Sequence, residues 1–478
     1  MRARLFAEEN KKWWTLVAVA FGLFMIMLDN TVVNVALPSI GKDLKISISE
    51  LEWIVTGYAL VFAALLITGG KLADMFGRRK IFVIGLVVFS ASSLACGLAP
   101  NAGFLIGARC AQGIGAALMN PATLSIITAT FPPRQRGQAI GIWAGVSALA
   151  LAIGPLVGGL IVDNIGWNWI FYVNVPIGIL GIVVSQLVIT ESRDTSREQS
   201  IDLPGLLTSG LALFALSYGL IEGNAKGWAS AEILGLFAVA AVLLVAFIVL
   251  ESRQRLPMLD LSLFRIGSFV GANVVALLVS LGMFGVFFFV SLYVQNILGY
   301  SPTKAGAIFL PMTVLIILIA PIAGKMSDRI GGRWLMGGGM TLLGISLLFY
   351  QRIGLHSNFW TLLPALILGG IGMALTMSPM TSVAMASVPV DKAGVGSGVL
   401  NSFRQIGGAL GIAVMGAILA SYLHAPAQSP LGAQQYVDGL HAALLVSAGI
   451  AFAAAIVAIV LVRVSPAVEK AHVEAIPA

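Results

Sequence analysis

The sequence predicts an all-α polytopic membrane protein, and three observations support that fold class. The chain has 478 residues, of which 58% are hydrophobic and 10% are charged, whereas soluble domains carry about 25% charged residues. Its mean hydropathy is +0.96. It contains fourteen apolar runs, each about 20 residues long, which is the length of a helix that crosses a bilayer. Motifs of the first half also recur in the second half, so two related helical bundles are expected.

The fourteen predicted spans follow one another through short polar loops, and an even number places both termini on the same side of the membrane. Of the 28 Lys and Arg residues, 21 fall in the segments on that side and 5 in the opposite loops. Positive charge gathers on the cytoplasmic side, so we predict a multi-pass protein of the cell (inner) membrane with cytoplasmic termini. The approximate limits of the spans are 15–37, 52–70, 81–99, 103–127, 137–162, 169–189, 203–221, 231–250, 268–290, 304–324, 334–352, 360–380, 397–420 and 441–463.

An internal duplication locates the domains. The stretch GKLADMFGRR (70–79) recurs as GKMSDRIGGR (324–333), and a second alignment pairs Gly154 with Gly411. Spans 1–6 therefore match spans 9–14, and spans 7 and 8 are an insertion. The predicted division is an N-terminal six-helix bundle (1–190), a linker with an inserted helix pair (191–261), a C-terminal six-helix bundle (262–465) and a cytoplasmic tail (466–478).

The repeated loop is predicted to be a short charged hinge between antiparallel helices. Glycine permits the positive φ that such a turn needs, and Asp and Arg side chains there can pair or meet the helix-terminal dipoles. A generic positively charged inner loop is the alternative, which two copies in register make weaker. The candidate residues of the two copies are Gly70, Asp74, Gly77, Arg78, Arg79, Asp328, Gly331 and Arg333.

Two charged residues fall deep inside apolar spans of the first half. A carboxylate such as Asp29 costs ~3 kcal/mol in a membrane span unless it faces a cavity or a partner, so it is a candidate proton-binding group. A capping or paired carboxylate near the outer end of the helix is the alternative. Buried arginines usually have carboxylate or carbonyl partners, and Asp29 is the obvious candidate for Arg109. Tethering of the fourth span to backbone carbonyls is the other interpretation of Arg109.

Further residues are candidates for the binding of a ligand or for helix bending. Asn34 and Gln112 could line the same cavity as Asp29, although helix packing explains each as well. The glycines of span 5 form a face for close helix packing, and its proline bends the helix. Together they indicate a hinge helix. Aromatic residues of span 9 could hold a flat lipophilic cation, and lipid-facing or packing roles are the alternative. The span 5 residues are Gly154, Pro155, Gly158 and Gly159, and the aromatic ones are Phe284, Phe288 and Tyr293.

Several function classes lack support in the sequence. No phosphate-binding G-x-x-x-x-G-K-[ST] motif occurs, and the four histidines fall in outer connections, at a span edge or in the tail. Cys96 and Cys110 lie inside predicted spans and are interpreted as small packing residues. We expect no metal, no cofactor, no enzymatic activity and no nucleic-acid partner, because membrane orientation explains the net charge of +7.

These motifs resemble the major facilitator superfamily, specifically its fourteen-span drug:proton antiporters, over essentially the whole chain. GKLADMFGRR is similar to the family's loop between spans 2 and 3, LDNTVVNVALP (28–38) to its first-span motif, RCAQGIGAA (109–117) to its fourth-span motif and AIGPLVGG (152–159) to its antiporter motif. The sequence departs at Ala150, where the family usually has glycine, and it lacks the acidic residue that some members carry in span 10.

The resemblance implies the major facilitator fold, with Asp29 as the protonatable carboxylate and Arg109 as its modulator. It also implies that Asp74, Arg78 and Arg79 form a conformational latch on the cytoplasmic side. The expected function is antiport, namely proton-coupled multidrug efflux of lipophilic, often cationic, small molecules by alternating access, with antibiotic resistance as a consequence. Expected partners are the substrate, protons and the bilayer, with the chain as a monomer. A dedicated exporter of one siderophore, lipid or amino acid, and a non-transporting sensor or assembly subunit, are the alternatives.

Overall fold

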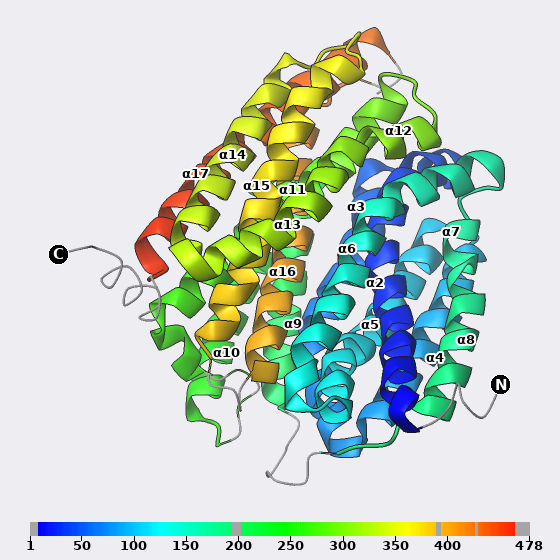
Figure 1. Ribbon diagram of the computed structural model, residues 1–478. Helices are drawn as coiled ribbons and strands as arrows, with labels where there is room; N and C mark the ends of the chain where they lie inside the picture. The colour runs from blue at the N-terminus through cyan, green and yellow to red at the C-terminus, as the bar shows by residue number, and fades with distance from the viewer. Residues whose placement is uncertain are drawn as a thin grey trace. The chain divides into compact units, whose positions relative to one another are not determined.

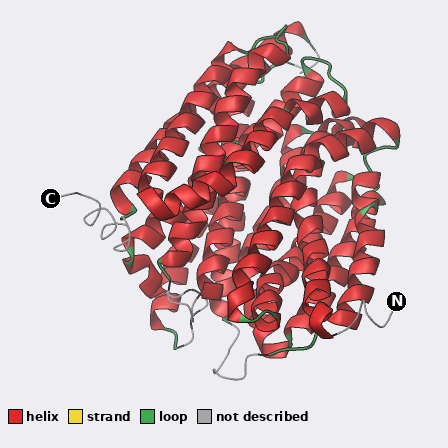
Figure 2. Cartoon of the chain, in the orientation of Figure 1, coloured by secondary structure: helices red, strands yellow, loops and turns green. Residues whose placement is uncertain are grey.

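The computed structural model describes residues 8–193, 202–255, 257, 259, 261–388, 393–425 and 429–463. Within them the chain is helical, with loops between the helices and no strand (Figure 2). The all-α prediction is therefore confirmed for the described part of the chain. The predicted tail 466–478 lies outside it.

The chain divides into two compact units, and the helices of each can be followed in Figure 1. Unit 1 comprises Met1–Leu216, Gly235–Leu259 and Ser301–Ala307, and unit 2 comprises Ser217–Leu234, Asp260–Tyr300 and Ile308–Ala478. The helices wholly in unit 1 are α2 (Glu8–Leu44), α3 (Ile48–Phe76), α4 (Arg78–Gly97), α5 (Ala102–Thr130), α6 (Pro133–Asn164), α7 (Trp169–Tyr172) and α8 (Asn174–Val188).

Unit 2 contains the helices that follow the insertion. They are η1 (Leu261–Arg265), α11 (Gly267–Asn296), α13 (Leu310–Ile330), α14 (Gly332–Phe349), η2 (Tyr350–Arg352), α15 (Phe359–Ala386), α16 (Ala393–Ala420) and α17 (Pro430–Leu461). The inserted pair, α9 (Leu203–Lys226) and α10 (Ala231–Arg253), contributes residues to both units, and the short α12 (Pro302–Ile308) falls mainly in unit 1.

Local sequence signals explain where several helices begin. The capping box of α3 has Ser47 Oγ accepting from the Glu50 amide at 3.3 Å and the Ser47 amide donating to Glu50 Oε2 at 2.8 Å, which satisfies two free helix donors. Asn101 caps α5 and Asn358 caps α15 by a single bond each, in which the side chain accepts from the amides of Phe104 and Thr361. Each of these caps is a short polar residue directly before an apolar run, so a sequence signal marks the helix start.

The glycines of the repeated loop adopt the conformation that the sequence predicts. Gly77 has a φ of 115° between α3 and α4, and Gly331 has a φ of 83° between α13 and α14. A side chain at either position would strain the backbone. Both units therefore contain the same helix–glycine–helix turn.

Twelve helical stretches of the described residues are long and apolar enough to cross a membrane. Predicted spans 137–162 and 334–352 are not among them. The first lies on α6, where several side chains fall outside the described part of the chain. The apolar stretch that is described on α6, Ile153–Asn164, is too short to be counted as a span. The second lies on α14, whose 18 residues include Arg333 and three successive glycines. The fourteen-span count therefore stays a prediction.

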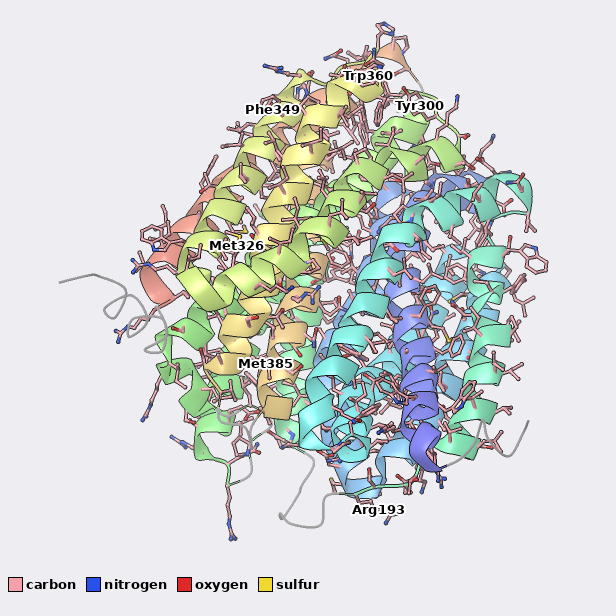
Figure 3. All side chains as sticks on the ribbon, viewed as in Figure 1. Arg193, Tyr300, Met326, Phe349, Trp360 and Met385 are labelled. Atoms are coloured by element: carbon pink, nitrogen blue, oxygen red, sulfur yellow. The ribbon has the colours of Figure 1, made fainter. Side chains whose placement is uncertain are left out.

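Exposed aromatic residues fit a membrane setting for these helices. Figure 3 shows Trp360 at the start of α15, where its side chain is 72% exposed. Tryptophan is enriched where helices leave the hydrocarbon core. Many of the large apolar side chains on the helix surfaces are likewise exposed, as expected of helices that face lipid.

Candidate functional site

Asp29 and Arg109 form an ion pair in the interior of unit 1. Asp29 lies on α2 and Arg109 on α5, and they are 3% and 1% exposed. Arg109 Nη1 donates to Asp29 Oδ2 at 2.5 Å, and Arg109 Nε donates to the carbonyl of Ile54 on α3 at 3.1 Å. The arginine thus has both partners that the sequence analysis weighed, a carboxylate and a backbone carbonyl.

Gln112 joins the two charged groups. Its Oε1 accepts from Arg109 Nη1 at 2.7 Å, and its Nε2 donates to Asp29 Oδ1 at 3.1 Å. Gln112 lies one turn of α5 from Arg109, so the spacing places both side chains on the same helix face. Each oxygen of Asp29 is therefore already engaged by a donor from α5.

The network continues to residues that the sequence analysis did not single out. Gln112 Nε2 also donates to Ser93 Oγ at 3.3 Å, and Asn174 Nδ2 donates to the same oxygen at 3.0 Å. The Ser93 hydroxyl donates to the carbonyl of Phe171 at 2.9 Å. Cys96 Sγ donates to Gln112 Oε1 at 3.7 Å, so Cys96 has a polar contact as well as a packing role. Short polar residues inside apolar spans were the available signal for Ser93 and Asn174.

Aromatic rings flank the guanidinium. The Arg109 Cζ atom lies 4.2 Å from the centroid of the Tyr58 ring and 5.8 Å from that of Phe171, within the range of cation–π attraction. The hydroxyl of Tyr58 is buried and has no hydrogen-bond partner among the described residues. Nothing in the sequence distinguishes Tyr58 from the other aromatic residues of its span. The site therefore has a buried cation, a buried anion and an unused hydroxyl within one bundle.

Asn34 makes a hydrogen bond within its own helix. Its Nδ2 donates to the carbonyl of Asn30 within α2 at 3.1 Å. The predicted substrate role of Asn34 stays a prediction.

The first copy of the repeated loop is held by two separate sets of contacts. Arg78 Nε donates to Asp74 Oδ1 at 2.8 Å, and Arg78 Nη1 lies 3.5 Å from the carbonyl of Ser125 on α5. Arg79 Nη1 donates to the carbonyl of Ile189 at 3.2 Å. The loop thus links the ends of α3 and α4 to α5 and to the segment after α8.

Glu191 was missed by the sequence analysis. Its carboxylate accepts from the backbone amides of Arg79 at 3.0 Å and Lys80 at 3.1 Å, which caps α4 with a negative charge where the helix dipole favours one. The sequence places Glu191 in a mixed-charge linker, far along the chain from α4. Only the tertiary fold brings it to this helix end.

The second copy of the loop shares the glycine turn of the first. Gly331 adopts the positive φ, and the Arg333 Cζ atom lies 5.2 Å from the centroid of the Trp334 ring. The side chain of Asp328 lies outside the described residues. An Asp–Arg pair in this copy therefore stays a prediction.

The span 5 motif makes close contacts on two sides of α6. A Cβ on Gly158 would lie 3.1 Å from the Cα atom of Val32 on α2, and one on Gly159 would clash with the backbone of Pro302 on α12. Asp163 Oδ2 accepts from the Thr303 amide at 2.8 Å and so caps α12. Gly154 faces α2, where a Cβ on it would collide with the Thr31 side chain. Pro155 faces α12, where its carbonyl would collide with a Cβ on Gly306. The small residues of the motif thus permit the close helix approach that the sequence predicts.

The predicted aromatic residues of span 9 lie in unit 2. Phe288 and Tyr293 are fully buried, Phe288 stacks edge-on with Phe289, and the Tyr293 hydroxyl donates to the carbonyl of Gly354 at 2.5 Å. Phe284 is half-buried. These contacts favour the packing alternative for Phe288 and Tyr293, and a substrate wall there stays a prediction.

The fold and the site together define a class of protein, the polytopic helical membrane protein, in which ionisable groups are shielded from lipid inside a bundle. Solved structures agree in fold. A bacterial homologue of the human lysosomal transporter Spinster, solved in an inward-facing and unoccupied conformation, matches with a TM-score of 0.67 at 18% identity, covering 96% of this chain and 99% of that one. A POT family transporter in complex with 5-aminolevulinic acid matches with a TM-score of 0.67 at 16% identity over 92% and 94% of the two chains.

The model of the Major Facilitator Superfamily matches residues 19–411 and 272–477. The chain belongs to this superfamily of membrane transporters, and the family indicates no catalytic activity.

Curated relatives cover most of the chain. The multidrug resistance protein Stp of Mycobacterium tuberculosis (strain CDC 1551 / Oshkosh) is 38% identical over 86% of this chain and 76% of its own length. The tetracenomycin C resistance and export protein of Streptomyces glaucescens is 37% identical over 86% and 77%. The puromycin resistance protein pur8 of Streptomyces alboniger is 36% identical over 95% and 92%.

Proposed function

We propose that this chain is a proton-coupled antiporter of the fourteen-span drug:proton family, which exports lipophilic, often cationic, small molecules by alternating access. The observation that carries the proposal is the buried carboxylate of Asp29, which Arg109 and Gln112 hold between them. The relatives named for multidrug resistance and for antibiotic export support efflux as the direction of transport.

In this proposal, proton binding by Asp29 loosens the link between α2 and α5. Arg109 donates to Oδ2 of Asp29 and Gln112 donates to Oδ1, so neutralisation of the carboxylate by a proton would weaken its ion pair with Arg109. Once Asp29 is neutral, Arg109 keeps the Ile54 carbonyl and the Tyr58 ring as partners. A substrate cation and a proton would therefore compete for the same carboxylate.

The contacts of the first loop fit the role of a cytoplasmic latch. Arg78 ties Asp74 to α5, and Arg79 binds the segment after α8. Opening of the transporter towards the cytoplasm would break these contacts. They would form again when the cytoplasmic side closes. We assign Asp74, Arg78 and Arg79 to the latch, and the glycines of α6 to the hinge.

The test is dye efflux from proteoliposomes under an imposed pH gradient, comparing the native chain with Asp29→Asn. The amide keeps the shape of the carboxyl group but holds no titratable proton, so gradient-driven efflux should be lost while binding of a neutral dye persists. Asp438→Asn is the matched control, because Asp438 is exposed and, among the described residues, accepts from Gln434 in its own helix at 2.9 Å. Equal transport by the native chain and Asp29→Asn would place the coupling carboxylate elsewhere.

A second candidate is a dedicated exporter of a single compound. Relatives named for one compound each, tetracenomycin C and puromycin, favour it. Competition experiments separate the two candidates. A multidrug exporter should show mutual inhibition among unrelated lipophilic dyes, whereas a dedicated exporter should respond to one structural class only.

We also propose an inner-membrane location with cytoplasmic termini, the four-part division at residues 190, 261 and 465, and action as a monomer. Reporter fusions at each terminus test the orientation. Gradient-driven transport by the purified chain in pure liposomes would speak against a sensor or assembly subunit, since no other protein would be present.

A further inference from the structure

One arginine of unit 2 lies inside a membrane span without a partner. Arg404 lies on α16, more than two helical turns from either end of the apolar stretch Val395–Ala420, and it is half-buried. It makes no hydrogen bond, ion pair or ring contact with any described residue. Arginine keeps its charge in proteins, and a charge at this depth is costly unless something pairs with it. Arg404 is therefore a permanent cation that lacks a counter-charge.

The other helices of unit 2 provide no carboxylate at this depth. In the sequences of α11 and α13 to α17, the acidic residues are Asp328 and Asp438. Asp328 belongs to the repeated loop at the end of α13. Asp438 is exposed, precedes the predicted span 441–463 and accepts from Gln434 in its own helix. The counter-charge of Arg404 therefore has to come from a bound molecule.

The glycines of α16 show which face of the helix carries Arg404. A Cβ on Gly407 would collide with the carbonyl of Leu277, and one on Gly411 with the carbonyl of Leu281, both on α11. Arg404 precedes these glycines by three and seven positions, and this spacing places it on the same face of the helix. The arginine thus lies beside α11 rather than on the lipid-facing side of α16.

The neighbouring residue, Gln405, is a second polar side chain without a partner. It is 8% exposed and makes no hydrogen bond with any described residue. A buried amide that lacks a partner carries a desolvation cost. None of the nitrogen and oxygen atoms of Arg404 and Gln405 is fully enclosed, so a small polar group can reach both side chains. A guanidinium fork binds a carboxylate through two N–H donors, and the amide offers a further donor.

An aromatic ring lies one helical turn beyond the two polar side chains. Gly408 follows Arg404 by four positions and Gln405 by three, so it is a neighbour of both on the helix surface. A Cβ on Gly408 would lie 3.1 Å from the ring of Phe284 on α11. Phe284 is half-buried, and it is one of the aromatic residues that the sequence predicts to contact a flat lipophilic substrate. The cation, the amide and the ring together suit an amphiphilic anion.

We propose that Arg404 and Gln405 bind the anionic group of the transported molecule, while Phe284 packs against its apolar body. This site rests on the proposed export function and names a substrate class for it, namely lipophilic organic anions and zwitterions with a carboxylate or a similar acidic group. The bound anion supplies the counter-charge that the helices of unit 2 lack.

Two dyes with the same xanthene ring system and opposite charge test the site. Fluorescein is an anion with a carboxylate, and rhodamine 6G is a cation. Fluorescence polarisation measures their binding to the purified full chain in detergent free of phospholipid. Arg404→Gln should weaken fluorescein binding roughly tenfold to hundredfold, the range expected when hydrogen bonds to a charged group are lost, and should not weaken rhodamine 6G binding. Arg404→Lys keeps the charge without the fork, so its fluorescein affinity should fall between the two.

Arg352→Gln is the matched control, because Arg352 is exposed and its guanidinium contacts the Phe349 ring. It should bind both dyes as the native chain does. Arg404→Gln removes an unpaired charge, so its thermal unfolding in detergent should not begin earlier than that of the native chain. Equal fluorescein affinity of the native chain and Arg404→Gln would overturn the proposed site. Displacement of fluorescein by added phosphatidylglycerol, without export of the dye, would assign Arg404 to a lipid headgroup and overturn it as well.

Export from proteoliposomes separates this site from proton coupling at Asp29. Arg404→Gln should lose fluorescein export and retain gradient-driven export of rhodamine 6G, whereas Asp29→Asn should lose gradient-driven export of both dyes and still bind fluorescein. Gradient-driven export of rhodamine 6G, combined with fluorescein binding that does not depend on Arg404, would refute this site alone. Fluorescein binding that depends on Arg404, without gradient-driven export of either dye, would refute the antiporter function alone.

Discussion

Single side chains determine the chemistry of unit 1. Asp29 has a donor on each carboxylate oxygen, and both donors come from α5. The sequence could identify Asp29 and Arg109 because a charge inside an apolar span is conspicuous. It could not show that Gln112 bridges them, since helix packing explains an amide equally well, and it gave no reason to choose Tyr58. These roles depend on distances between helices.

The ion pair supports a prediction about stability. Arg109→Gln should lower the free energy of unfolding by about 3–5 kcal/mol, because it leaves the Asp29 carboxylate buried without its cation. Adding Asp29→Asn should restore most of the loss, since the double variant buries no net charge. Unfolding in detergent measures both.

Arg352→Gln is the matched control for this prediction. Arg352 is exposed and its guanidinium lies 4.9 Å from the centroid of the Phe349 ring, so its substitution should change stability little. An Arg109→Gln variant as stable as this control would mean that the pair contributes nothing to the fold.

At the scale of helices, apolar length predicted most of the elements, and short polar caps marked several of their starts. The sequence was least informative where contacts join distant segments. Glu191 caps α4 and Glu251 is buried beside Asp202, although both occur in mixed-charge stretches that are typical of exposed loops. Both contacts join segments that lie far apart in the chain, which no local pattern encodes.

The contact between α6 and α12 supports a prediction about packing. A Cβ on Gly306 would collide with the carbonyl of Pro155, so Gly306→Ala should destabilise the protein by about 1–3 kcal/mol through overpacking and should slow transport. Stability in detergent and initial efflux rates measure the two effects.

Gly338→Ala provides the comparison for that variant. Gly338 is also helical, but a Cβ there meets no atom within 4 Å, so alanine should be neutral or stabilise the helix by up to about 1 kcal/mol. If the two alanine variants behaved alike, close packing of α6 on α12 would not matter.

At the scale of the whole molecule, the duplicated motifs predicted two units. They did not predict that the paired charges occur in the first unit alone. The glycine turn is present in both units. The ion pair is not repeated in sequence: the position 254 residues after Asp29 is Met283, and the one after Arg109 is Leu363. The two units therefore share a backbone plan, while the paired charges belong to the first. The four-part division itself stays a prediction.

This asymmetry leads to a prediction about the driving force. If Asp29 is the only coupling group, one proton exchanges for one monovalent cation and no net charge moves. A membrane potential imposed without a pH gradient should then leave the transport of a monovalent dye unchanged, although a moving charge would gain about 2.3 kcal/mol per 100 mV. Valinomycin-clamped proteoliposomes measure this, and a rate that follows the potential would require a second coupled proton.

The thiol of Cys96 has a consequence for experiment. It donates to Gln112 Oε1, the same oxygen that accepts from Arg109. Sulfhydryl stretching absorbs in a spectral window that is almost free of other protein bands, and its frequency follows hydrogen-bond strength. The native chain therefore contains a label-free vibrational reporter one bond away from the buried ion pair, and its band should shift whenever Gln112 changes partners.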